Sequence, residues 1–196
     1  MATKPLQDAE EVEVASAEAL RDWLARHHSR ARGVWLVTYK KAAGERYLPT
    51  GEIVDECLCW GWVDSLPRAK DALRTMLWIS PRKAGSNWSR VNKEKVARLE
   101  AAGRMQAPGR DAIARAKADG SWTALDAVED LVIPPDLQEG FDARPGSEAA
   151  WHALPRSVKR GALEQLLNAK QAATRARRIA TIVEDSAAGK RPFQPG

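Results

Sequence analysis

The side chains best suited to chemistry lie between residues 53 and 92, where tryptophan, glycine, aspartate and basic residues form two dense blocks around an apolar run. In the second block, residues 80–89 form a loop before a predicted helix. Gly85 and Ser86 bring backbone N–H groups to that helix start, where such groups point outward with the positive end of the helix dipole. This combination predicts a surface site for a small anion or a sugar-phosphate-like ligand.

Five side chains are expected to line this site: Asp64, Arg82, Lys83, Trp88 and Asn92. Arg82 and Lys83 bring positive charge, Trp88 a flat apolar face, and Asn92 a donor and an acceptor one turn later. The competing interpretation is an ordinary capped helix with Trp88 packed inward and a solvent-exposed basic rim. In that case Asp64 simply holds a loop through backbone hydrogen bonds.

The two cysteines, Cys57 and Cys59, are poor candidates for a metal site. A structural zinc ion takes four ligands, usually from two Cys/His pairs, and three histidines are the only other soft ligands in the chain. Cys57 also falls on the apolar stripe of a predicted helix, where a free thiol behaves as a small hydrophobe. We therefore predict a buried, unligated cysteine and no metal.

Three acids on the same predicted helix, Glu52, Asp55 and Glu56, have the oxygen ligands that suit iron. We expect them instead on a solvent-exposed helix face, near the N-terminus, where the helix dipole favours negative charge. An iron-handling role stays open as an alternative that requires these acids to converge in space.

The sequence contains no recognisable catalytic arrangement. A Gly-x-Ser-x-Gly elbow, a His-Glu-x-x-His motif and a phosphate-binding glycine loop are all missing, and histidine is scarce. A nucleophile also needs a nearby general base. No enzymatic activity and no cofactor are predicted.

Composition describes an ordinary globular protein with a mild positive bias. The chain has 196 residues, 29% of them charged, with a formal charge of +5 and a pI of about 9.4. Basic residues gather in residues 82–117 and 170–178. Nucleic-acid binding by these basic helices is therefore an alternative, although the bias is weaker than in a dedicated nucleic-acid binder.

Cysteine usage and the first residues favour a cytoplasmic location. A disulfide between Cys57 and Cys59 is improbable on geometry, so the thiols are expected to be reduced. The N-terminus is polar and acidic rather than signal-like. No apolar stretch reaches the ~20 residues that span a bilayer, so membrane insertion is not expected.

Periodicity predicts an α+β fold: a small N-terminal sheet with covering helices, followed by a mostly helical C-terminal half. The sheet is expected to pair strands at residues 34–40 and 73–79, and helices at residues 16–28 and 52–60 are expected to cover it. Trp60, Trp62 and Trp78 fall within apolar runs and are predicted core residues. The predicted domain bounds are a flexible acidic tail at 1–14, an α+β domain at 15–104, a helical region packed on it at 105–190, and a flexible end at 191–196.

Turns and helix starts are predicted from local signals. Residues 41–49 are expected to form a turn or hairpin loop, and residues 67–71 a turn. A helix that begins at Ser86 or Ser89 and ends near residue 102 is expected to bury Val91, Val96 and Leu99. Pro108 is expected in the first turn of the following helix.

Several segments in a fixed order resemble a known family. They are Leu-Cys-Trp-Gly-Trp-Val-Asp at 58–64, Ser-Pro-Arg-Lys at 80–83, Ser-Asn-Trp-Ser-Arg-Val-Asn at 86–92, Gly-Arg-Met at 103–105 and Thr-Arg-Ala-Arg-Arg-Ile at 174–179. This series is similar to the YdeI/OmpD-associated family and covers about residues 16–190. Proteins of that family are described as bacteriocin-protection or stress-resistance proteins of bacteria. The resemblance assigns no catalytic residue.

Together, these observations predict a non-enzymatic stress-protection or accessory protein that binds a small anionic ligand or a protein partner. The alternatives are a nucleic-acid-binding protein that uses its basic helical surface, and an iron-handling protein.

Overall fold

The computed structural model describes residue 6 and residues 9–193, which form two compact units. The first unit contains the residues up to 86 together with 91–122, and the second contains 87–90 together with those from 123 onward. Residues 1–5 and 7–8 of the predicted tail and 194–196 of the predicted flexible end lie outside the described residues. The predicted domain boundary at residue 104 stays a prediction.

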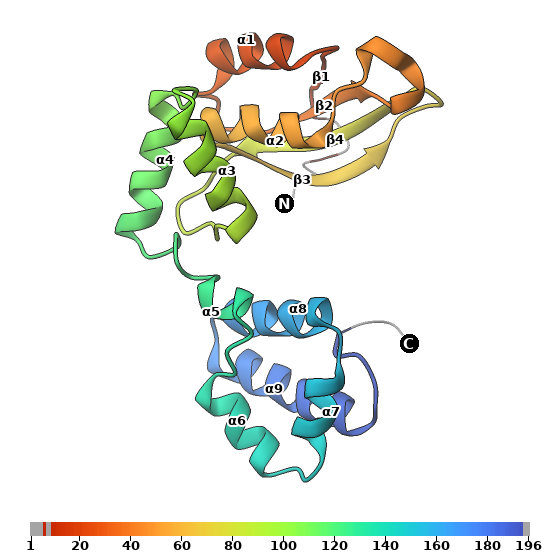
Figure 1. Cartoon of the computed structure of the whole chain (residues 1–196), viewed down its shortest axis with the longest axis vertical. Helices are drawn as coiled ribbons and strands as arrows, with labels where there is room; N and C mark the ends of the chain where they lie inside the picture. The colour runs from red at the N-terminus through yellow and green to blue at the C-terminus, as the bar shows by residue number, and fades with distance from the viewer. Residues whose placement is uncertain (1–5, 7–8, 194–196) are drawn as a thin grey trace, which may run out of the picture. The chain divides into compact units, whose positions relative to one another are not determined.

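The first unit is built on a four-stranded sheet with the order β1-β2-β4-β3 (Figure 1). Its strands are β1 (Glu11–Glu13), β2 (Val34–Tyr39), β3 (Trp62–Ala69) and β4 (Arg74–Pro81). β2 and β4 are the two strands that the sequence predicted, and they pair antiparallel along the whole length of β2, from Val34 opposite Ile79 to Tyr39 opposite Arg74. The predicted α+β class is confirmed.

The N-terminal strand β1 corrects the expectation of a flexible tail over residues 1–14. β1 pairs in parallel with β2, so the tail is structured at least over Glu11–Glu13. Val12 packs against the core, whereas Glu11 forms an ion pair with Lys70 and Glu13 with Arg74. A three-residue alternation is too short to signal a strand by itself, since its stability comes from pairing with β2.

The edge strand β3 extends further than expected. Residues 67–71 were predicted as a turn, but β3 continues to Ala69. A shift of register between Asp64 and Pro67 interrupts its pairing with β4. Proline lacks an N–H donor and is tolerated on an edge strand or at a bulge, and β3 provides both conditions.

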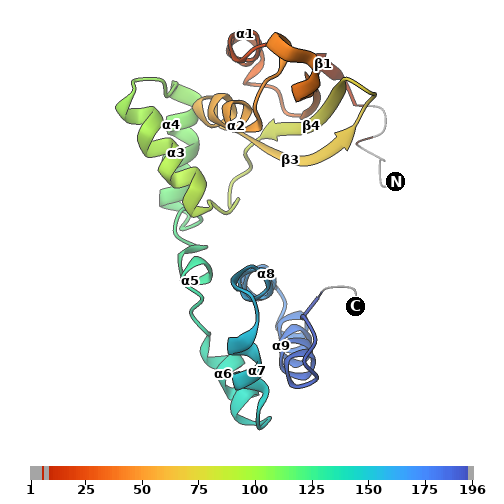
Figure 2. The same cartoon turned by 45° about the vertical axis from the view of Figure 1, so that its right-hand side comes forward.

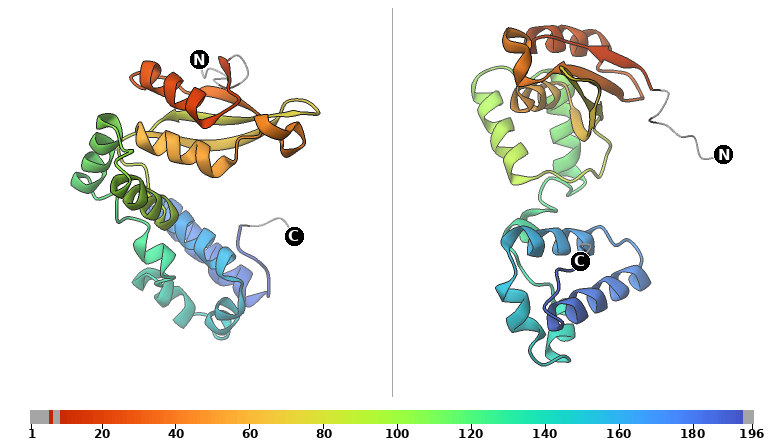
Figure 3. Two further views of the ribbon diagram at one scale, coloured as in Figure 1. Left: turned by 45° about the horizontal axis from the view of Figure 1, so that its top comes forward. Right: turned by 90° about the vertical axis from the view of Figure 1, so that its right-hand side faces the viewer.

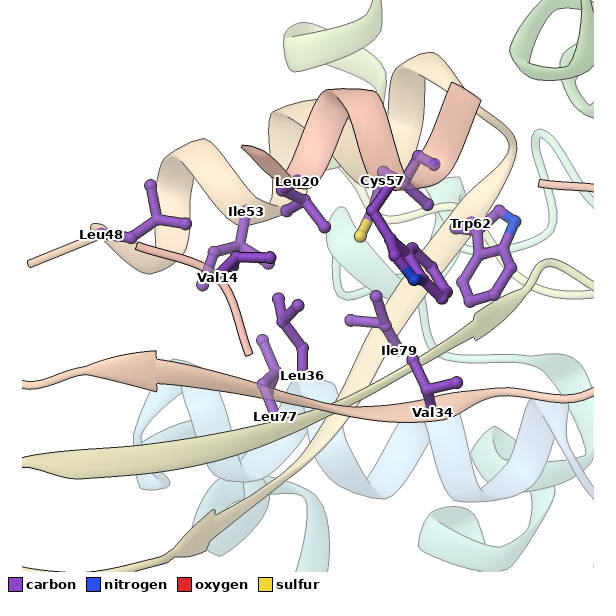
Figure 4. Close-up of a cluster of buried hydrophobic side chains, with 12 residues drawn as sticks. Val14, Leu20, Val34, Leu36, Leu48, Ile53, Cys57, Trp62, Leu77 and Ile79 are labelled. Carbon is purple, nitrogen blue, oxygen red and sulfur yellow. The ribbon is translucent and has the colours of Figure 1, made fainter. Parts of the chain in front are cut away.

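Two helices cover one face of the sheet, as predicted. They are α1 (Ala17–His27) and α2 (Thr50–Cys59), and both lie on the same side of the strands in Figure 1. Ser16 caps α1 by accepting a hydrogen bond from the N–H of Ala19 at 3.1 Å. Figure 4 shows the core between these layers, where Leu20 and Ile53 from the helices face Leu36 and Ile79 from the strands.

The tryptophan and glycine motif at residues 58–64 turns the chain from α2 into β3. Trp62 is 1% exposed and belongs to the core, as predicted, whereas Trp60 and Trp78 are only partly buried. Gly61 has a φ of +72°, and a Cβ there would lie 2.7 Å from the carbonyl oxygen of Pro108. Glycine is required at this position both for its backbone conformation and for the close approach of the helix that contains Pro108.

Two further helices complete the first unit: α3 (Arg90–Ala101) and α4 (Ala107–Ala118). Pro108 stands in the first turn of α4, as predicted. Val96 and Leu99 of α3 are buried, but Val91, expected inside with them, is 60% exposed. Residue 91 lies about 140° around the helix axis from residue 96, so its side chain is on a different face of α3 from the buried Val96.

The second unit is a helical bundle. Its helices are α5 (Asp126–Glu129), α6 (Pro135–Asp142), α7 (Ser147–Ala153), α8 (Arg156–Leu167) and α9 (Ala172–Ala187), visible in Figures 2 and 3. Leu137, Trp151, Leu166 and Ile182 are among its buried side chains. No strand occurs between residues 105 and 185, all of which the structure describes, so the predicted helical C-terminal half is confirmed. Among the described residues, no helix is both long and apolar enough to cross a membrane.

Candidate functional site

The loop after β4 carries Arg82, the most buried of the predicted site residues in the first unit. Its backbone N–H donates to the carbonyl oxygen of Gly61 at 2.9 Å, and the residue is only 7% exposed. Burial lowers the pKa of the Arg82 guanidinium to about 10, although the negative charge of Asp64 acts in the opposite direction. The fold therefore holds a cation near Asp64 in a place with little access to water.

The backbone donors of this loop are engaged within the chain, which corrects one part of the predicted site. The N–H of Gly85 donates to Oδ2 of Asp119 at 2.9 Å, and the N–H of Ser86 donates to the carbonyl oxygen of Lys83. Hydrogen bonds from Ser121 and Gly85 hold the pKa of Asp119 below its usual value. A carboxylate of the chain itself thus occupies the anion position expected at a helix start, and α3 begins only at Arg90.

The other predicted residues do not share one environment. Lys83 is exposed, whereas Asp64 and Asn92 are half-buried. Trp88 is 1% exposed, which is a correction to the expectation that its ring faces a ligand. Residues 87–90 also group with the second unit, while the other four predicted residues belong to the first. Asp64 and Arg82 are therefore the pair whose proximity the structure supports.

Asp55 and Glu56 of α2 overturn the prediction of a solvent-exposed acidic face. They are 5% and 1% exposed. Asp55 accepts hydrogen bonds from Lys95 and Arg98 of α3, both at 2.6 Å. Burial alone would raise the pKa of Asp55, but these two cations hold it below its usual value. The helix pattern could not reveal this, because the cations come from a segment forty residues away.

Glu56 forms a second such arrangement. Its carboxylate accepts hydrogen bonds from Nη2 of Arg21 in α1 and from Nη2 of Arg104 after α3, each at 2.7 Å. The two arginine side chains are 48% and 37% exposed, so they cover the buried carboxylate on its solvent side. Through these ion pairs, Asp55 and Glu56 connect α2 to α1, to α3 and to Arg104. Within residue 6 and residues 9–193, no group of three or more His, Cys, Asp or Glu is placed to hold a metal ion.

Both thiols are buried, as predicted for Cys57. Cys57 lies in the core, where burial raises its pKa strongly, and burial raises the pKa of Cys59 to about 11.

Since the thiolate is the reactive form, neither thiol should react with an aromatic disulfide reagent in the native protein at pH 8. Both should react after unfolding in denaturant. Release of one thiol equivalent within minutes from the native protein would contradict this account.

Several basic residues between 82 and 117 are paired within the chain, so fewer of them can bind a partner than their number suggests. Lys95, Arg98 and Arg104 neutralise buried acids, and Arg110 donates to the carbonyl oxygen of Met105. In the second basic segment, Arg175 is bound to Asp136. Trp122 forms an aromatic and basic cluster with two lysines: the centroid of its half-buried ring lies 5.9 Å from Nζ of Lys93 and 5.3 Å from Nζ of Lys117.

The surface has one feature that the sequence did not predict. A depression of about 390 Å³ lies where β2 ends and β4 begins, and Tyr39, Arg46 and Leu73 are among its lining residues. The sequence predicted only a turn or hairpin loop over residues 41–49. The signal it offered was the adjacent Arg46 and Tyr47, a cation next to an aromatic side chain.

Two family models match the chain, one mainly over the first unit and one within the second. Residues 12–112, about half of the chain, match the family described as "Domain of unknown function (DUF8412)". Residues 130–189 match the family described as "Bacteriocin-protection, YdeI or OmpD-Associated". Comparison with curated proteins and with solved structures gave no match.

The predicted family resemblance is therefore confirmed in the helical part of the chain, whereas the four resembling segments between residues 58 and 105 all lie in the other match. The chain belongs to the DUF8412 family through residues 12–112, and its residues 130–189 match the family described as bacteriocin-protection, YdeI or OmpD-associated.

Proposed function

We propose that this chain is a non-enzymatic stress-protection or accessory protein of bacteria that binds an anionic ligand or partner through the loop after β4. Arg82 and Lys83 supply the positive charge in this proposal, and Asp64 and Asn92 flank them. The match of residues 130–189 to the bacteriocin-protection family supports the role in protection. The charged residues of the loop after β4 support the binding of an anion.

The observation that carries the proposal is the burial of Arg82 beside Asp64. Removing a guanidinium from water is costly, and here the effect of burial on its pKa exceeds the effect of the Asp64 charge. A second negative group that reaches the guanidinium would further stabilise it. Lys83, the next residue, is exposed and would meet the same anion from solvent.

The test is the thermal stability of the protein with phosphate against chloride at constant ionic strength. A ligand that binds only the folded protein, present at tenfold its Kd, should raise the Tm by roughly 3–5 °C. Lys83→Gln should reduce this rise, because an exposed lysine contributes charge without supporting the fold. The matched control is Lys41→Gln, an exposed lysine elsewhere in the same unit, which should keep the full rise.

A second candidate function, nucleic-acid binding, is favoured by the cluster at Trp122. A base that stacks on an aromatic ring beside two lysines is a common arrangement in single-strand binding. Affinity for a DNA oligonucleotide that falls steeply with salt would support this candidate, whereas no binding at about 100 mM salt would favour the accessory role.

A further inference from the structure

We propose that the first unit has a second binding site, in the depression where β2 ends and β4 begins, for a carboxylate group attached to an apolar body. The site lies at the opposite end of β4 from Arg82 and Lys83, so it is separate from the function proposed above. The lining residues are Tyr39, Arg46, Asp71, Ala72, Leu73 and Arg74. Figure 1 shows the two segments that form it, η1 (Lys41–Arg46) in orange and the β3–β4 turn in yellow, at the same end of the sheet.

The cation available to a ligand is Arg46. Arg74 is already engaged by two carboxylates, through Nε to Asp71 at 2.7 Å and through Nη1 to Glu13 at 2.7 Å. The guanidinium carbon of Arg46 instead lies over the ring of Tyr39, 4.3 Å from its centroid. Within residue 6 and residues 9–193, no carboxylate forms an ion pair with Arg46.

Stacking on Tyr39 prepares Arg46 for a planar anion. The ring limits the orientations of the guanidinium and so reduces the entropy that a ligand must overcome. The planar guanidinium can then offer two parallel N–H donors, which match the two oxygens of a carboxylate. Arg46 itself is exposed, so a ligand reaches it from solvent.

Apolar surface next to Arg46 accounts for the rest of the ligand. Leu73 lines the depression and is 46% exposed, and Tyr47, 41% exposed, forms a β-bridge with Tyr39. Both tyrosines of the chain therefore meet at this place. Tyrosine and arginine are among the residues enriched at the energetic centres of binding surfaces.

The apolar surface also distinguishes a carboxylate with an apolar body from phosphate. Asp71 lines the same depression but is already paired with Arg74, and phosphate has no apolar part to bury against Leu73. The volume of about 390 Å³ is at the small end of ligand sites. A ligand of about ten heavy atoms at ordinary ligand efficiency binds with a Kd in the millimolar range.

The test is a titration of ¹⁵N-labelled protein with benzoate, followed through the backbone amide signals in NMR. Benzoate should shift the amides of residues 44–47 and 71–74 with saturation in the millimolar range, whereas acetate, benzamide and phosphate should bind at least about tenfold more weakly. Arg46→Gln should weaken benzoate binding by about tenfold or more, and Arg26→Gln, an exposed arginine of α1, should leave it unchanged. Lys83→Gln should also leave it unchanged, which separates this site from the loop after β4.

Two results would overturn the proposal. One is equal benzoate binding by the wild type and Arg46→Gln. The other is a benzoate response that does not saturate or that appears at amides away from residues 44–47 and 71–74. Because Arg46 is exposed, the spectrum of the free variant should overlay that of the wild type outside its own neighbourhood, which confirms that the fold is intact.

Discussion

Removing both arginines that cover Glu56 should destabilise the protein far more than removing either one. Glu56 is 1% exposed and is held by Arg21 and Arg104 alone among side chains of the described residues. Arg21→Gln or Arg104→Gln should each lower the free energy of unfolding by about 1–2 kcal/mol, since one charged hydrogen-bond partner remains. The double variant should lower the free energy of unfolding by about 3–5 kcal/mol beyond the sum of the two single effects. The reason is that it leaves a buried carboxylate without a cation.

The measurement is urea unfolding followed by circular dichroism, with the three variants arranged as a double-mutant cycle. Adding Glu56→Gln to the double variant is the control, since it removes the buried charge and should restore much of the lost stability. Strictly additive single effects, or no recovery with Glu56→Gln, would show that Glu56 does not depend on these arginines.

Trp88→Ala should lower the free energy of unfolding by about 3–5 kcal/mol. The side chain is 1% exposed, so its truncation removes buried apolar surface and leaves a cavity. Tyr47→Ala is the matched control: Tyr47 is 41% exposed, and its loss should cost no more than about 0.5 kcal/mol. The two variants should be compared by urea unfolding monitored by circular dichroism, which does not depend on Trp88 fluorescence.

A small effect of Trp88→Ala on stability, combined with loss of anion binding, would return Trp88 to the ligand site. The expected result instead assigns the Ser-Asn-Trp-Ser segment at residues 86–89 to packing and leaves ligand binding to Arg82, Lys83 and their neighbours.

Those parts of the fold that depend on local pattern were predictable from the sequence. β2 and β4 carry runs of β-branched and aromatic residues, and Ser16, Pro108 and Pro155 mark helix starts through capping or through a fixed φ. β1 was missed because three residues carry no periodic signal, and the end of β3 was missed because Pro67 normally indicates a turn.

The candidate site was harder to predict because its electrostatics depend on distant segments. The sequence placed Glu56 on an open helix face, whereas Arg21 and Arg104 reach it from 35 and 48 residues away. In the same way, the N–H of Gly85 was expected to face an external anion, but Asp119 lies 34 residues further along the chain and accepts its hydrogen bond. Charge counted along a sequence cannot separate cations that neutralise buried acids from cations that face solvent.

The most direct test of the proposed function is the phosphate-dependent change in Tm of the wild type and Lys83→Gln at constant ionic strength. If the loop after β4 binds an anion through Arg82 and Lys83, phosphate should raise the Tm of the wild type and of Lys41→Gln by the same amount, and that of Lys83→Gln by clearly less. An equal rise in all three proteins, or none in any, would contradict an anion site at this loop.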